Sequence, residues 1–277
     1  DQLTLSTPQS DFGQVTQNIS GDAVDVATGY YNYELALGDS GTDLGILYTL
    51  TQVDIHSGQT LTLSESGSLT AQITSSGGTG NLEIAQSGNV TLGESDKESL
   101  NSYSGNTTVL GQLTAYENAL GKTQHLNVSG IYVNAGSNAV DHLSVDAEGS
   151  LVLNANLTLS HGSTSTGSAV SGALSGAGAL VVSRGTLTLN ENGASAYTGT
   201  VELGSGNEAA NLVLNGAEAL ASGSVTFVNS ASSIEINDSG SVAFANALSG
   251  LGSLSVNLSG KGFSFANAEA NLSTGSN

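Results

Sequence analysis

The feature that most constrains this chain is a short unit of the form apolar–any–apolar, ended by Gly, Asn or Ser, which recurs through most of the sequence. Alternation of this kind predicts short β-strands with one buried face. The clearest copies are Leu61–Leu63, Leu82–Ile84, Val90–Leu92, Leu151–Leu153, Leu157–Leu159, Leu187–Leu189, Leu212–Leu214, Ile234–Ile236 and Leu254–Val256. They recur at roughly 20–25 residues, with shorter steps between, as expected when each coil of a solenoid contributes two or three strands. The sequence therefore predicts an all-β fold, a parallel β-helix (β-solenoid).

The dimensions of such a solenoid follow from strand geometry. Each coil adds a strand about 4.8 Å above the last, so on the order of 11–13 coils would form a rod of about 55–60 Å. The single proline, Pro8, precedes all of the predicted strands, which leaves their hydrogen-bond ladder uninterrupted. A longer internal repeat relates Tyr103–Thr107 to Tyr197–Thr200, which fits stacked coils of slightly unequal length.

Charge and composition exclude several classes of function. The 277 residues include 24 Asp and Glu but only 4 Lys and Arg, a formal charge of −20, so binding of nucleic acid is excluded. Cys is absent, which rules out disulfides and thiolate metal sites. No run of about 18 apolar residues occurs, and Asp1–Ser10 lacks the pattern of a signal peptide. We therefore expect a soluble piece of a longer protein.

Catalytic and metal-binding motifs are weak, so we expect no enzyme, cofactor or metal. Gly38–Gly41 has the form of the nucleophile motif of chymotrypsin-like proteases. In those proteases the catalytic His precedes the Ser, whereas the first His of this chain, His56, follows it, so a turn is the better interpretation. His125, His142 and His161 are also scattered along the sequence. A polysaccharide-degrading enzyme stays open as an alternative, because paired carboxylates across a groove would suffice for hydrolysis and acids are plentiful.

Two sets of polar residues are candidates for binding. Asn follows the apolar unit at four places, where side-chain amides of successive coils can form a ladder at one corner or take part in self-recognition; these are Asn154, Asn190, Asn215 and Asn237. The polar loop Gly93–Ser102 is a candidate ligand-binding loop, with Glu94, Asp96, Glu98 and Asn101 as its candidate residues.

Several segments resemble the passenger domains of Gram-negative autotransporters of the AIDA-I/antigen 43 type. Tyr31–Leu35, Gly45–Ile55 and Ser57–Leu63 carry this resemblance, Tyr103–Leu113 is similar to the passenger-associated repeat of that family, and Tyr197–Val201 is a shorter version. The resemblance covers most of residues 30–265. It implies a right-handed parallel β-helix over residues 30–277, preceded by a lead-in coil or less regular segment over residues 1–29. It also implies exposure at the bacterial cell surface, with attachment to the outer membrane through a carboxy-terminal barrel that this chain does not contain.

The resemblance implies adhesion as the function. The preferred hypothesis is a surface adhesin that promotes bacterial aggregation and biofilm formation through many weak polar contacts between rods, without insertion of this domain into a membrane. One alternative is an adhesin for a host glycan or matrix protein. A purely structural stalk is a further alternative.

Overall fold

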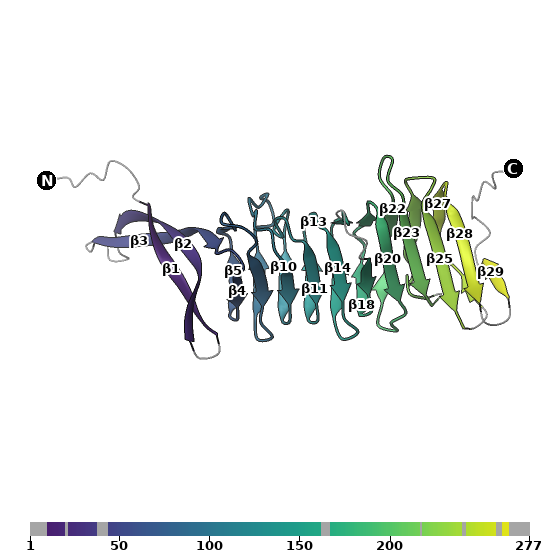
Figure 1. Cartoon of the computed structure of the whole chain (residues 1–277), viewed down its shortest axis with the longest axis horizontal. Coiled ribbons are helices and arrows are strands. Elements are labelled where there is room, and N and C mark those ends of the chain that lie inside the picture. The colour runs from purple at the N-terminus through teal and green to yellow at the C-terminus, as the bar shows by residue number, and fades with distance from the viewer. Residues whose placement is uncertain are drawn as a thin grey trace.

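The computed structural model shows an elongated solenoid that carries a long antiparallel ribbon at its amino-terminal end (Figure 1). The structure describes residues 10–19, 22–37, 44–161, 167–216, 218–239, 242–258 and 262–265. Every regular element in these ranges is a β-strand, and the strands of the solenoid pair in parallel. The prediction of an all-β solenoid is confirmed.

Three long parallel sheets form the sides of the rod. The ten-stranded sheet contains β4 (Thr60–Leu63), β7 (Asn81–Ile84), β9 (Thr107–Val109), β11 (His125–Val128), β14 (His142–Val145), β17 (Ser168–Val170), β20 (Gly185–Asn190), β23 (Ala210–Asn215), β25 (Ser233–Asp238) and β28 (Ser253–Leu258). The seven-stranded sheet contains β5 (Ser66–Leu69), β8 (Asn89–Leu92), β10 (Gln112–Ala115), β12 (Ile131–Asn134), β15 (Ser150–Leu153), β18 (Ala173–Gly176) and β21 (Ala196–Tyr197). The six-stranded sheet contains β13 (Asn138–Val140), β16 (Leu157–Leu159), β19 (Leu180–Val182), β22 (Thr200–Leu203), β24 (Ser224–Phe227) and β27 (Leu248–Gly250).

A typical coil visits the three sheets in turn, as β11, β12, β13 and then β14 show. In Figure 1 the strands of the ten-stranded sheet lie on the viewer's side and point downward while the chain advances from left to right, which is right-handed winding. The coils are unequal in length, since the step from Leu126 to its partner Leu143 is shorter than the step from Leu187 to its partner Leu212. Ten strands in the longest sheet make nine steps rather than the 11–13 coils expected, because part of the chain lies outside the solenoid.

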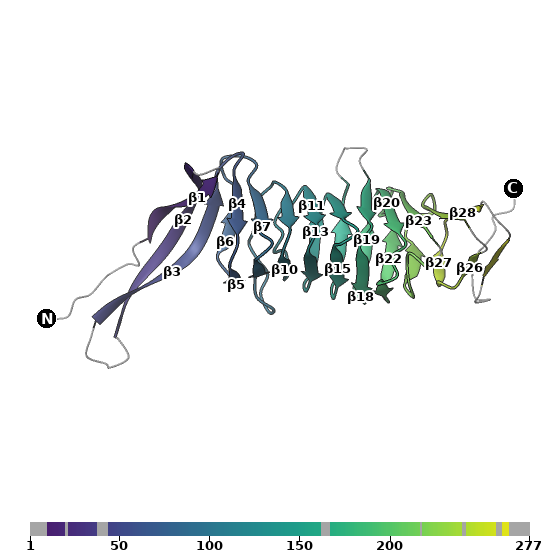
Figure 2. The same ribbon diagram turned by 90° about the horizontal axis from the view of Figure 1, so that it is seen from below.

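The amino-terminal part is an antiparallel ribbon of β1 (Ser10–Ile19), β2 (Asp22–Leu37) and β3 (Leu44–Ile55). The end of β3 pairs in parallel with β6 (Gln72–Thr74), which joins the ribbon to the first coil (Figure 2). The boundary expected between residues 29 and 30 therefore falls inside β2, and the change of architecture lies between β3 and β4. A two-stranded parallel pair, β26 (Val242–Phe244) with β29 (Phe263–Phe265), stands near the other end.

The core is a narrow column of aliphatic side chains, because each strand turns alternate residues inward and the parallel register stacks them. Leu82 lies on Leu61, and Leu212 on Leu187, all of them buried. Burial of this apolar surface supplies the main driving force for stacking, at about 25 cal/mol per Å².

The two copies of the longer internal repeat also have similar structures at their first tyrosine. Tyr103 and Tyr197 are both fully buried, and the carbonyl of each accepts a backbone hydrogen bond, from Lys122 and Ser222 respectively. Burial raises the pKa of both phenols despite their hydrogen bonds.

Candidate interaction surface

The acidic loop predicted to bind a ligand is largely engaged within the molecule. Glu94 forms an ion pair with Lys97 at 2.5 Å, and Glu98 accepts a hydrogen bond from the amide of Asn118 at 2.8 Å. The side chain of Asn101 bridges two coils, since its Oδ1 accepts from the Ile73 amide at 2.7 Å and its Nδ2 donates to the Ala119 carbonyl at 2.8 Å. Asp96 is exposed. The structure thus gives Asn101 a role in coil stacking.

The asparagine ladder forms at three of its four predicted positions. Asn215 donates to Asn190 at 2.8 Å, and Asn237 donates to Asn215 at 3.3 Å, along the edge of the ten-stranded sheet. Asn257 extends the ladder by donating to Asn237 at 2.9 Å. Asn154 lies apart, because it follows β15 in the seven-stranded sheet and its side chain is exposed. The missed member, Asn257, follows the unit Leu254–Val256 and had the same sequence signal as the others.

Asn215→Ala is expected to lower the free energy of unfolding by about 1 kcal/mol, because it removes two hydrogen bonds of the ladder that are exposed to solvent. Asn127→Ala on the same sheet is the matched control, since that side chain has no hydrogen bond to any described residue and a change within about 0.5 kcal/mol is expected. Urea denaturation of both variants measures the difference. Equal stability of the two variants would show that the ladder contributes nothing.

Three histidines that are scattered along the sequence lie side by side at the start of successive coils. The rings of His125 and His142 stack with centroids 4.7 Å apart, and His161 meets His142 edge-on at 5.2 Å. His142 and His161 are buried. This grouping corrects the expectation of isolated histidines, and it arises because the parallel register sets His125 beside His142.

The surroundings of His161 are those of a neutral imidazole. Its Nε2 lies 2.8 Å from the hydroxyl of Ser168, and its Nδ1 is buried without a hydrogen-bond partner among the described residues. Arg184 donates to the backbone carbonyl of His161, and Asp141 accepts from Ser160 next to it. Burial, followed by the neighbouring His142 ring, lowers the pKa of His161. Within the described ranges, no group of three or more His, Asp or Glu side chains is placed to hold a metal ion.

The lowered pKa of His161 predicts acid sensitivity. The unfolded chain, with a His pKa of about 6.5, takes up the proton more readily, so this contribution to stability is intact above that pH and is lost as the pH falls through the folded-state pKa. Thermal unfolding measured from about pH 8 to pH 5 should show falling stability. His161→Asn, which suits the positive φ of 42° at this position, should flatten that dependence. An unchanged pH profile in the variant would contradict the assignment.

The outward faces of the three long sheets carry few charges. In the described strands, the acidic residues at outward positions are Glu83 and Glu235 on the ten-stranded sheet and Glu202 on the six-stranded sheet. The described strands of the seven-stranded sheet have none, and their outward residues are Ser66, Ser68, Asn89, Thr91, Gln112, Thr114, Ile131, Val133, Ser150, Val152, Ala173, Ser175 and Ala196. Among the described residues, the other acids of the solenoid lie in its turns and corners, as Glu117 and Asp146 do, except Asp238, which is the last residue of β25.

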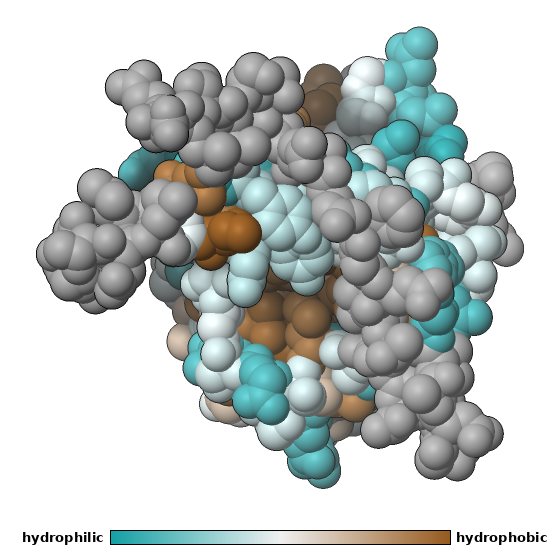
Figure 3. Space-filling model, turned by 90° about the vertical axis from the view of Figure 1, so that its left-hand side faces the viewer, coloured by the Kyte–Doolittle hydropathy of each residue, from teal (hydrophilic) through white to brown (hydrophobic). Residues whose placement is uncertain are grey.

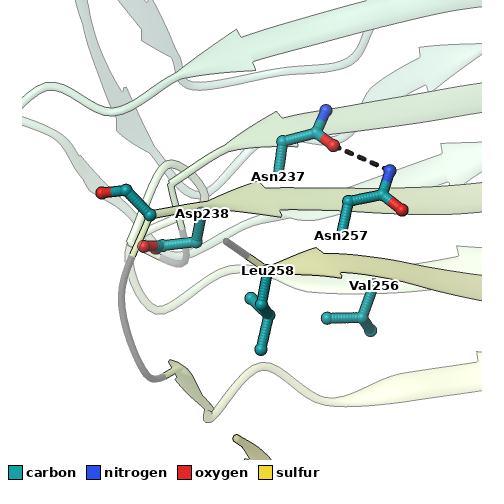
Figure 4. A pocket seen from close by; sticks show the side chains of 6 residues that line it. Asn237, Asp238, Val256, Asn257 and Leu258 are labelled. Carbon is teal, nitrogen blue, oxygen red and sulfur yellow. Dashed lines mark hydrogen bonds between the residues drawn. The ribbon is translucent and has the colours of Figure 1, made fainter. Parts of the chain in front are cut away.

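The two ends of the molecule differ from its sides. At the amino-terminal end, Ile46, Leu47 and Tyr48 of β3 are more than half exposed, and Figure 3 shows apolar atoms in the middle of that end. At the other end, a shallow depression is lined by the last strands of the ten-stranded sheet. Figure 4 shows Asn237 and Asn257 pointing away from Val256 and Leu258 there, with Asp238 as the one acidic side chain of the described lining. A single carboxylate does not provide the opposed pair that glycoside hydrolysis needs.

Comparison with curated proteins gives a partial match. The chain is similar to the "Uncharacterized lipoprotein YdeK" of Escherichia coli (strain K12). The two are 34% identical over 200 residues, which is 68% of this chain but 14% of that relative. The chain therefore spans a small part of the relative's length. No family model matches the chain, and no solved structure matches it.

Two further expectations from the sequence concern the protease-like motif and membrane-spanning segments. Gly38–Gly41 lies outside the described residues. In the described part of the chain, no helix is long and apolar enough to cross a membrane.

Proposed function

We propose that this chain is the rod of a bacterial cell-envelope adhesin of the autotransporter-passenger type, which promotes cell aggregation and biofilm formation by self-association and without catalysis. The β-solenoid fold supports this proposal, as do the passenger-like motifs at Tyr103–Leu113 and Tyr197–Val201. The similarity to a protein described as a lipoprotein supports a place in the cell envelope.

The observation that carries the proposal is the separation of charge from the flat faces. A chain with a formal charge of −20 repels its own copies, and this opposes any contact that buries acids. Here the acids of the solenoid stand mostly in turns and corners, so that flat faces of Ser, Thr, Asn and aliphatic residues can meet. At physiological salt the Debye length is about 8 Å, which screens the exposed acids at the rims.

Adhesion through such faces depends on the number of contacts that form at once. Each hydrogen bond between rods contributes about 0.5–1.5 kcal/mol net, so single contacts are reversible. A cell that displays many copies gains avidity from simultaneous contacts.

Cell settling tests this proposal. Bacteria that display the chain should clump and settle faster than bacteria that display an unrelated β-solenoid of similar length, and the clumping should need no second cell type. Settling equal to that of the control would overturn the proposal. Clumping that requires host cells or a coat of glycan or matrix protein would favour a host-directed adhesin, and release of sugar from a polysaccharide would favour an enzyme.

A further inference from the structure

The seven-stranded sheet has an outward surface unlike those of the other two long sheets. Its strands lie along the lower side of the rod in Figure 2, and the register arranges its outward residues in two straight columns. No described residue in these columns is charged, whereas both other long sheets expose at least one glutamate. This surface is therefore where a second copy of a strongly acidic chain meets the least repulsion.

An aliphatic cluster occupies the centre of this surface. Val133 of β12 lies directly beside Val152 of β15, and Ile131 stands two residues before Val133 on the same strand. Ile131 is 43% exposed, and the two valines are partly exposed. Since β12 is the middle strand of the seven, polar residues such as Thr114 flank the cluster on one side, and the small residues Ala173 and Ser175 flank it on the other.

We infer that the outward surface of the seven-stranded sheet is the self-association interface, where a second copy of this chain packs face to face about a twofold axis near β12. This inference rests on the proposed function. Such an axis brings the aliphatic cluster of one copy onto the cluster of the other and sets the uncharged flanks of the two copies against each other. Two β-sheets pack this way about 10 Å apart.

The size of the surface predicts a weak interaction. Seven strands spaced about 4.8 Å apart and about four residues long cover about 30 Å by 13 Å, or about 400 Å² on each copy. Stable interfaces bury about 800 Å² per partner. The isolated chain should therefore be monomeric when dilute, and the interface should act only where many copies face one another, as between two cells.

A valine series tests the inference, because each long sheet has at least one partly exposed, outward valine. These are Val133 on the seven-stranded sheet, Val213 on the ten-stranded sheet and Val181 on the six-stranded sheet. Each is changed to Glu in the full chain, which is attached to beads through its amino terminus, and clustering is followed by light scattering. Val133→Glu should slow clustering at least about tenfold, since the twofold axis brings two buried like charges together. Val213→Glu and Val181→Glu should stay within about twofold of the unchanged chain.

A substitution of opposite charge distinguishes an effect at the interface from an effect of the overall negative charge. Val133→Lys reduces the overall negative charge, yet it also places like charges across the axis and should slow clustering as Val133→Glu does. Clustering of the unchanged chain should accelerate as salt is raised, because the acids at the rims, such as Asp146 and Glu117, are then screened. Circular dichroism and melting temperatures verify folding, and Thr114→Glu on the adjacent strand replaces Val133→Glu should that variant fail to fold.

The outcomes distinguish this inference from the function on which it rests. Beads with the unchanged chain that never cluster would overturn both. Beads that cluster equally with Val133→Glu and Val213→Glu would overturn the interface and leave self-association intact. Loss of clustering only with Val213→Glu or Val181→Glu would move the interface to another sheet.

Discussion

Gly130→Ala is expected to lower the free energy of unfolding by about 2–3 kcal/mol, the cost of forcing a methyl group against the backbone of the neighbouring coil. Gly130 stands immediately before β12, at the corner between the ten-stranded and seven-stranded sheets. A Cβ atom there would lie 2.0 Å from the carbonyl oxygen of Gly111 in the coil below. That carbonyl cannot move aside freely, because it accepts the ladder hydrogen bond from Ile131 at 2.8 Å.

The corner glycines make this effect general. Gly88, Gly111, Gly149 and Gly172 each precede a strand of the seven-stranded sheet, and a Cβ at any of them would lie within 2.6 Å of a backbone oxygen. Gly193→Ala is the matched control, since nothing described lies within 4 Å of its Cβ position, and it should change stability by less than about 0.5 kcal/mol. Urea denaturation measures both variants. Equal stability of Gly130→Ala and Gly193→Ala would show that the corner opens without cost.

Asn134→Ala should have a comparable effect, about 2–3 kcal/mol, because it removes four hydrogen bonds and leaves the buried hydroxyl of Tyr132 without a partner among the described residues. Asn134 is fully buried at the end of β12, where its Nδ2 donates to the carbonyls of Ala155 and Asn156 at 2.9 and 3.0 Å. Its Oδ1 accepts from the hydroxyl of Tyr132 at 2.7 Å and from the amide of Asn138 at 3.0 Å. The side chain therefore ties two coils together inside the corner.

Asn154→Ala provides the comparison for this prediction. Asn154 follows β15, the next strand of the same sheet, but its side chain is exposed and makes no hydrogen bond with the described residues. The variant should therefore lower the free energy of unfolding by less than about 0.5 kcal/mol. Thermal and urea unfolding of both variants measure the difference. A loss below about 1 kcal/mol for Asn134→Ala would mean that water replaces the lost amide within the corner.

The predicted polar sites show how far local sequence patterns reach. The ladder at Asn190, Asn215 and Asn237 was predictable, since each residue follows the same apolar unit and parallel strands stack equivalent residues. Asn154 follows the same unit but belongs to another sheet, and the local pattern does not say to which side of the coil a strand belongs. The buried pair Asn134 and Asn138 was missed, because an amide that serves the interior has the same local sequence as one that faces solvent.

The antiparallel pairing of the ribbon and the grouping of the histidines could be found only from the tertiary structure. Residues 30–37 and 44–55 alternate as solenoid strands do, yet they pair antiparallel, and alternation alone does not report the direction of the partner strand. His125, His142 and His161 come together only because the lengths of the two coils that separate them set their register.

The sequence alone determined that the chain is all-β, that its strands stack as a solenoid and that its surface is strongly acidic, because alternation, period and composition are local or additive properties. The tertiary structure alone decided which residues share a face. Coil lengths vary, as the unequal steps from Leu126 to Leu143 and from Leu187 to Leu212 show, so a residue's position around the rod depends on the length of every turn before it. The charge-free surface of the seven-stranded sheet is a result of that accumulated register.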